Sequence, residues 1–333
     1  MAINLRGRTA SSDPSGRPVA KQPTKVSAKA ARYIKLGPKG SWERRCVAEG
    51  ILLFGYQSVP HELAMSRDQE RLTRFVEKQG HKKGTAKRHA LQILDFYTLG
   101  ADTLWITFAD GFLWWCFAEP EVFDLGLDDE KASREGSKLR RTVNGWHNMS
   151  VGGRPLFISE LNGALVQTRR FQGTICDVKL FDYLLRKLND EDLPEISRAR
   201  EARRQSHTAI QGLMALLTWR DFEILVDLVF SASGGRRIGE GGGSQKTVDL
   251  ELVLPTTGER AFVQIKSRTS QAQLDDYVER LKNRPEARMF YVYHSADASL
   301  VVGNPGVRLI GPDRLAEMVL DAGLFTWLLQ KAG

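Results

Sequence analysis

The residues whose types and spacing could do chemistry lie in the last third of the chain, in the stretch ERAFVQIKSRTSQ from Glu259 to Gln271. On an extended segment successive side chains alternate between faces, so Gln264 and Lys266 point to one side while Val263 and Ile265 point to the other. A buried apolar strand does not need an amide and an ammonium on one face. The pair therefore indicates a site that handles a polar substrate or an ion.

Two carboxylates are predicted to join this pair. In the preceding stretch KTVDLELVL, the alternation turns Asp249 away from the apolar face that Leu250 begins. If the two strands pair as neighbours, Asp249 approaches Gln264 and Lys266 at one edge of the sheet. Glu223 lies on the amphipathic helix WRDFEILVDLVF, from which it would reach the same point from the side.

Oxygen ligands beside an ammonium suit the hydrolysis of phosphodiesters. A divalent cation supplies a hydroxide nucleophile and neutralises charge on the transition state, and Mg²⁺ needs only one or two protein carboxylates because it keeps several waters. Lys266 would orient and help deprotonate the attacking water, and would stabilise charge on the phosphoryl oxygens. The predicted ligands of Mg²⁺ or Mn²⁺ are Asp249, Gln264 through its amide oxygen, Ile265 through its backbone carbonyl, and Glu223.

The order of these elements is similar to that of a nuclease superfamily. A helix with Glu223, a glycine-rich loop, a strand with Val248-Asp249 and an apolar strand ending in Gln264-Ile265-Lys266 resemble the PD-(D/E)xK nucleases over roughly residues 207 to 300. The closest likeness is to their Mrr-like branch, in which a glutamine often replaces the acid. The resemblance implies a restriction-endonuclease-like fold, magnesium-dependent cleavage of DNA, and a role in restriction or antiphage defence.

Two other functions remain open. Because an amide replaces an acid at position 264, the protein could instead be a catalytically weak or inactive DNA-binding protein that retains the fold, and an RNA-directed nuclease is a third possibility. Cutting both strands of DNA calls for two active sites, so a homodimer is expected. The candidate DNA contacts are Ser267, Arg268, Arg203, Arg204 and, in the glycine-rich loop, Lys246.

The length and the charge distribution predict four segments. With 333 residues the chain is expected to form two domains. The predicted segments, in chain order, are a disordered basic tail (1–40), an N-terminal recognition domain (41–180), a helical basic connector (181–206) and a nuclease domain (207–333). The nuclease domain is expected to be α/β, with a mixed central sheet flanked by helices. Residues 1–40 hold nine Lys or Arg and one Asp, so this segment alone accounts for the net charge of +8. DNA binding must then use a local patch or the tail.

The N-terminal domain is predicted to be α+β, with helices followed by a small curved β structure, for which a barrel-like form is one alternative. Asp110-Gly111 between two β-rich runs predicts a tight hairpin. The alternation is expected to separate Trp105 and Trp115 from Trp114. Residues 100–175 loosely resemble the PUA and EVE modules, which implies an aromatic pocket for a flipped or modified base. The base-reading candidates are Trp105, Trp114, Trp115 and Trp146, with a purely structural role in the core as the alternative.

The remaining composition points to a cytoplasmic protein. The three cysteines have neither a zinc-ligand spacing nor that of a disulfide framework, and the six histidines show no metal spacing. No apolar run approaches the roughly 20 residues that span a bilayer, and the N-terminus lacks the apolar segment of a secretory signal. We therefore expect a reducing compartment and no membrane partner.

Overall fold

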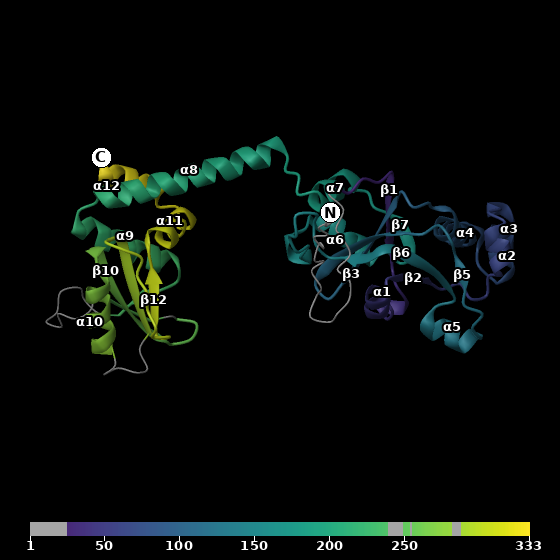
Figure 1. Cartoon of the computed structure of the whole chain (residues 1–333), viewed down its shortest axis with the longest axis horizontal. Helices are drawn as coiled ribbons and strands as arrows, with labels where there is room; N and C mark the ends of the chain where they lie inside the picture. Colours follow the sequence, from purple (N-terminus) through teal and green to yellow (C-terminus); the bar gives the residue numbers. More distant parts are fainter. Residues whose placement is uncertain (1–24, 239–248, 254, 282–287) are drawn as a thin grey trace, which may run out of the picture. The chain divides into compact units, whose positions relative to one another are not determined.

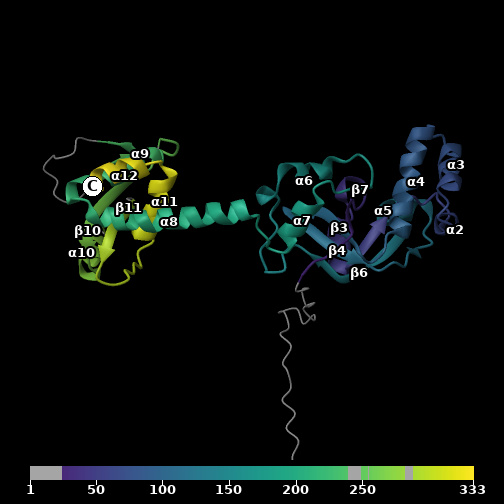
Figure 2. The same ribbon diagram turned by 90° about the horizontal axis from the view of Figure 1, so that it is seen from above.

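The computed structural model describes residues 25–238, 249–253, 255–281 and 288–333 (Figures 1 and 2). The chain divides into two compact units, Met1–Asp192 and Leu193–Gly333. The division falls inside the predicted connector, whose first part is helix α7 of the N-terminal unit and whose remainder belongs to helix α8 of the C-terminal unit. In the ranges described, none of the helices combines the length and the apolar character needed to span a bilayer.

The C-terminal unit is an α/β domain with a mixed five-stranded sheet flanked by helices, as the sequence predicted. The strand order is β12-β11-β10-β9-β8; β10 runs parallel to β11 and β11 to β12, whereas the β9 pairings are antiparallel. Its elements are α8 (Pro194–Leu216), α9 (Trp219–Ala232), β8 (Arg236–Arg237), β9 (Leu250–Val253), β10 (Arg260–Thr269), α10 (Gln271–Leu281), β11 (Arg288–Ala296), β12 (Val307–Ile310), α11 (Pro312–Asp321) and α12 (Phe325–Ala332).

The two faces of this sheet have different cores, and that difference positions the site. Helix α9 is capped at Thr218, whose hydroxyl accepts the Asp221 N–H at 3.2 Å, as the sequence predicted. The apolar stripe of α9 packs against one face of the sheet together with Val263 and Ile265 of β10. On the opposite face Leu274 of α10 packs against Tyr291 of β11, and Figure 1 shows α10 beside β10. Because side chains alternate along β10, Gln264 and Lys266 lie on the α10 face.

The N-terminal unit is α+β. Its sheet has the order β2-β6-β4-β3-β1-β7, with β5 beside β6, and its β1–β3 pair is parallel while the other pairs are antiparallel. In the described part of the chain β2 and β7 end this order without pairing to each other, so the barrel-like form expected from the sequence is not seen. Its elements are β1 (Ala30–Ile34), η1 (Pro38–Gly40), α1 (Glu43–Glu49), β2 (Ile51–Phe54), α2 (His61–Met65), α3 (Gln69–Lys78), α4 (Lys83–Thr98), β3 (Thr103–Ala109), β4 (Phe112–Ala118), β5 (Phe123–Asp124), α5 (Asp129–Glu135), β6 (Lys138–His147), η2 (Ile158–Glu160), α6 (Gly163–Gln167), η3 (Thr168–Arg170), β7 (Ile175–Asp177) and α7 (Phe181–Leu188).

The segment predicted as a tail is partly a structural element of this unit. Residues 25–40, placed in the tail by their basic composition, contain strand β1, which lies between β3 and β7. Val26, Tyr33 and Ile34 are buried in the cores of the unit. The composition of residues 1–40 concealed this strand because its apolar positions are interleaved with lysine and arginine. Residues 1–24 lie outside the described ranges.

The predicted hairpin is confirmed, but the predicted placement of its tryptophans is wrong. Asp110 and Gly111 have φ values of 47° and 85°, as a two-residue turn between β3 and β4 requires. Trp105 lies opposite Cys116 and Ile106 opposite Trp115, so Trp105 shares its face with Trp114. Across this turn each odd-numbered residue pairs with an even-numbered one. Odd-numbered residues of β3 therefore share a face of the sheet with even-numbered residues of β4.

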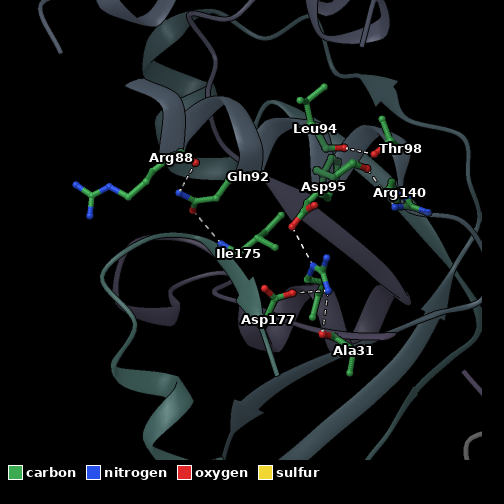
Figure 3. A network of polar contacts seen from close by, with 11 residues as sticks. Ala31, Arg88, Gln92, Leu94, Asp95, Thr98, Arg140, Ile175 and Asp177 are labelled. Atoms are coloured by element: carbon green, nitrogen blue, oxygen red, sulfur yellow. Dashed lines mark hydrogen bonds and ion pairs between the residues drawn. The ribbon is translucent and has the colours of Figure 1, made fainter. Parts of the chain in front are cut away.

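A polar network fastens helix α4 to strands β1 and β7 (Figure 3). Arg32 of β1 donates from Nε to Asp95 Oδ2 of α4 at 2.9 Å, and its Nη1 lies 2.6 Å from Asp177 Oδ1 of β7. One turn earlier on α4, Gln92 Oε1 accepts the N–H groups of Thr174 and Ile175 at 2.6 and 3.0 Å. The helix is therefore held to the sheet by groups that pair with the backbone as well as by apolar packing.

Candidate active site

The structure brings Asp249 and Gln264 together at the start of β9. Asp249 Oδ2 accepts hydrogen bonds from the Gln264 amide nitrogen and, at 2.6 Å, from the backbone N–H of Ile265. The side chain of Gln264 is only 3% exposed, so this contact satisfies an amide that would otherwise be buried without a partner. The predicted approach of Asp249 to the β10 strand is confirmed. Gln264 uses its nitrogen to hold the carboxylate, and its ligation of a metal through oxygen stays a prediction, as does that of the Ile265 carbonyl.

The electrostatics of the two acids are coupled. Burial raises the pKa of Asp249, and the Ile265 N–H, the Lys266 ammonium and the Gln264 amide oppose that rise. Burial also raises the pKa of Glu223, and the negative charge of Asp249 raises it further. The Arg220 guanidinium and the Lys266 ammonium oppose this rise in the pKa of Glu223, so the charges of Asp249 and Lys266 both act on Glu223. Two acids in this relation are stabilised by a cation placed near both.

Lys266 supplies the positive charge of the site. Burial lowers the pKa of Lys266, but a hydrogen bond with Tyr277 and the charge of Asp249 outweigh burial, so the pKa is raised overall. Its Nζ lies 5.2 Å from the centre of the Tyr277 ring on α10. The ammonium is thus protonated at neutral pH, which suits charge stabilisation and water orientation rather than proton abstraction.

The donor set fits a hard divalent cation. Within the ranges that the structure describes, His, Cys, Asp and Glu side chains form no group of three or more suited to a metal. The carboxylates of Asp249 and Glu223 remain, and oxygen ligands of this kind suit Mg²⁺ or Mn²⁺ with retained waters rather than zinc.

The arginines predicted to contact DNA belong to the C-terminal unit, and each of them forms an ion pair. Arg268 pairs with Asp297 at 2.9 Å. Arg203 of α8 pairs with Asp321 at 3.0 Å, and Arg204 pairs with Glu201. Ser267 is half-buried, next to Lys266, and Lys246 lies outside the described residues. Because the three arginine pairs are exposed, each is weak enough for a phosphate to compete for the guanidinium.

The tryptophans proposed to read a base are part of the core. Trp105, Trp115 and Trp146 are at most 7% exposed. Trp105 and Trp146 belong to one core cluster, against which the half-buried Trp114 packs, and Trp115 belongs to a second. The indole nitrogens of Trp115 and Trp146 donate to the carbonyls of Met149 and Ile51 at 2.9 and 3.0 Å. These rings are therefore engaged in holding the sheet together, and the structural interpretation of them is the one the geometry favours.

Sequence reasoning missed two aromatic residues near the site. Tyr277 belongs to the apolar stripe of α10 and was indistinguishable from a core residue by its spacing. Trp219 begins α9 one helical turn before Glu223, and its side chain is 61% exposed, with the Arg220 guanidinium 5.4 Å from its ring. The sequence offers one signal for Trp219, its position at the start of a helix, where a tryptophan is seldom needed for core packing.

Three comparisons with known proteins found nothing similar to this chain. A scan against protein-family models, a search of curated proteins and a search of solved structures each found no match.

Proposed function

We propose that the C-terminal unit is a metal-dependent endonuclease that hydrolyses phosphodiester bonds of DNA with Mg²⁺ or Mn²⁺. The observation that supports this most is the contact of Asp249 with the Gln264 amide and the Ile265 N–H, which places a carboxylate beside the strand that carries the ammonium of Lys266. Hydrolysis of a phosphodiester requires opposite charges of this kind, because a hydroxide must form beside a phosphate that becomes more negative.

Each residue has a distinct task in this proposal. A bound divalent cation would lower the pKa of a water and neutralise charge on the phosphate. Asp249 and Glu223 would hold that cation, and the Gln264 amide and the Ile265 N–H fix the orientation of Asp249. Lys266, whose ammonium lies 5.2 Å from the centre of the Tyr277 ring, orients the water and stabilises the negative charge on the phosphoryl oxygens.

The wider role belongs to the same proposal. The α/β sheet and the order of its elements are compatible with a PD-(D/E)xK nuclease of the Mrr-like branch, acting on modified or foreign DNA as a homodimer whose two sites cut the two strands. The N-terminal unit would select the target. The three free cysteines, two of them buried, agree with a reducing compartment such as the cytoplasm.

One observation favours a second candidate function, a non-catalytic DNA-binding protein. The Gln264 amide donates to the carboxylate oxygen of Asp249 that would otherwise be open to a cation. An amide in this position lowers the negative charge of the site by one unit relative to an acid. A protein with weakened metal affinity could still bind DNA through its exposed arginines.

Cleavage of DNA by matched variants separates the two functions. Phage DNA with and without base modification is incubated with Mg²⁺ or Mn²⁺ and with the native chain, Asp249→Asn or Lys266→Ala. Asp276→Asn and Lys331→Ala, which alter exposed residues of the same unit, serve as controls. The nuclease proposal requires metal-dependent cutting that both site variants lose and both controls keep. Binding that persists in every variant, with no cutting of any DNA or RNA, would establish the second function instead.

A further inference from the structure

The N-terminal unit contains a cavity of about 520 Å³ that none of the predicted base-reading tryptophans lines. Its volume lies in the range of small-molecule sites. The wall is built from the turn after β1, the loop after β2, the end of α3 with the turn that follows it, the first half of α4, Ala132 of α5, and residues 172–174. The side chains that matter for its chemistry are Lys35, Lys39, Trp42, Tyr56, His81 and His89.

The interior of this cavity is aromatic and neutral. The Tyr56 hydroxyl and His89 Nδ1 lie 2.5 Å apart, and the His89 ring lies 5.0 Å from that of His81. Burial, with the charges of His81 and Arg88, lowers the pKa of His89, and burial raises the pKa of Tyr56 to about 12. Both groups therefore donate and accept hydrogen bonds without charge at neutral pH, which matches the edge of a planar heteroaromatic ring.

The rim of the cavity is positively charged. Among the described residues that line it there are two lysines and no carboxylate. Lys35 donates from Nζ to the Phe171 carbonyl at 2.5 Å, which holds its ammonium at the edge, and Lys39 is exposed. An anionic group at the rim would meet these ammonium groups without displacing a carboxylate.

The backbone around the cavity is held in conformations that ordinary residues avoid. Tyr56 and Lys39 have φ values of 62° and 54°, and Gly37 between β1 and Lys39 has φ of 83°. Left-handed non-glycine residues are strained and gather at ligand sites. The Tyr56 ring stacks on Phe54 with ring centres 4.9 Å apart, and its hydroxyl meets His89.

One helix fixes both sides of the cavity. His89 and Gln92 lie one turn apart on α4, and Gln92 accepts the N–H groups of Thr174 and Ile175, the second of which Figure 3 shows. A Cβ at Gly173 would lie 2.6 Å from Gln92 Oε1, so the chain can approach the amide this closely only with glycine there. The wall at residues 173–174 is therefore preorganised relative to His89.

We propose that this cavity binds a nucleotide, with its base beside Tyr56 and His89 and its phosphate at Lys35 and Lys39. A nucleotide unit of a nucleic-acid strand and a free mononucleotide share this chemistry. Binding of a nucleotide unit within a strand rests on the proposed nuclease function, because the cavity would then recognise an unpaired or extruded nucleotide of the DNA. Binding of a free mononucleotide does not depend on that function. The second source would make it a ligand-sensing site.

Calorimetric titration of the full chain tests the proposal. The ligands are the four 2′-deoxynucleoside 5′-monophosphates, inorganic phosphate, a duplex with one unpaired nucleotide and the same duplex fully paired. Titrations contain EDTA, so binding is measured without cleavage and its outcome is independent of Asp249. Tyr56→Phe, which removes only the hydroxyl, and Lys39→Ala are expected to weaken binding about tenfold each, because each loses one hydrogen bond or one charge contact. Lys179→Ala, an exposed lysine of the same unit away from the cavity, is the control.

The results divide cleanly. Mononucleotide binding that both variants weaken, with the two duplexes bound equally, supports the proposal with a free nucleotide as the ligand. Tighter binding of the duplex with the unpaired residue, by a margin that both variants remove, supports a strand as the source. The proposal is overturned if neither ligand binds, if inorganic phosphate binds as tightly as a nucleotide, or if the control weakens binding as much as Lys39→Ala does.

Discussion

Replacing Gln264 with glutamate would turn the hydrogen bond to Asp249 into a repulsion between two acids. The native amide donates to Asp249 Oδ2 from a side chain that is only 3% exposed. The variant loses a hydrogen bond to a charged group, worth about 1.5–3 kcal/mol. Two charges about 4 Å apart add about 4 kcal/mol at an effective dielectric constant of 20. Protonation of one acid limits the total, so we expect about 4 kcal/mol of destabilisation at pH 7.5 without metal.

The pH dependence gives the sign of the effect. The repulsion raises the folded-state pKa of this acid pair above the unfolded value of about 4. An acid whose pKa is raised on folding makes the folded state less stable as the pH rises through the unfolded pKa towards the folded one. Gln264→Glu should therefore be close to Gln264→Met in stability near pH 5 and clearly less stable at pH 8. The methionine variant keeps the volume and loses only the hydrogen bond.

Hydrogen exchange measures this in the intact chain, because it reports opening free energies locally. Amides of β10 and β11 should exchange faster in Gln264→Glu than in Gln264→Met at pH 8, while amides of β3 in the other unit serve as the internal reference. Mn²⁺ should restore protection in the glutamate variant more than in the native chain, because the cation replaces the repulsion with attraction. Equal exchange in the two variants at pH 8, or protection that does not respond to Mn²⁺, would refute the account of the site as two acids around a cation.

Two further predictions concern stability and DNA binding. Arg140 is fully buried and donates to the carbonyls of Phe96, Leu99, Ala118 and Glu119. Arg140→Met should therefore lower the free energy of unfolding of the N-terminal unit, measured by urea denaturation, by about 3–5 kcal/mol. The matched change at the exposed Arg141, Arg141→Met, should lower it by less than about 0.5 kcal/mol. Trp219→Ala should weaken single-stranded DNA binding about tenfold in fluorescence anisotropy, because stacking on one base is worth roughly 1–3 kcal/mol. Ile224→Ala, which alters an exposed residue on the same helix, should leave that affinity unchanged.

The site in the C-terminal unit could be predicted from the sequence because strand alternation is a local property. The positions of Gln264 and Lys266 on one face, and of Asp249 beside them, follow from period-two patterning once the two strands pair. The role of Tyr277 could not be found in this way. Its contact with Lys266 depends on where α10 crosses the sheet, which the helix pattern alone does not specify.

The N-terminal unit shows where local patterns are insufficient. Alternation correctly marked the hairpin, but the facing of Trp105 and Trp114 depends on the register across the turn, which the turn length sets. The cavity was invisible to the sequence because Lys35, Tyr56 and His89 come from three separate elements and meet only through the fold. A search for aromatic residues close in sequence therefore selected the core tryptophans in place of the cavity.

The burial of Gln264 connects stability and function in one contact. A buried amide must be bonded, and Asp249 is the partner that satisfies it, so Asp249→Ala would leave both the Gln264 amide and the Ile265 N–H without an acceptor. Asp249→Asn keeps an acceptor oxygen in the same place and removes only the charge, including the cost of burying it. The two variants therefore differ in folding but should be alike in metal binding. An asparagine variant that stays folded and binds no Mn²⁺ would show that the charge of Asp249, rather than its place in the hydrogen-bond network, is what the site requires.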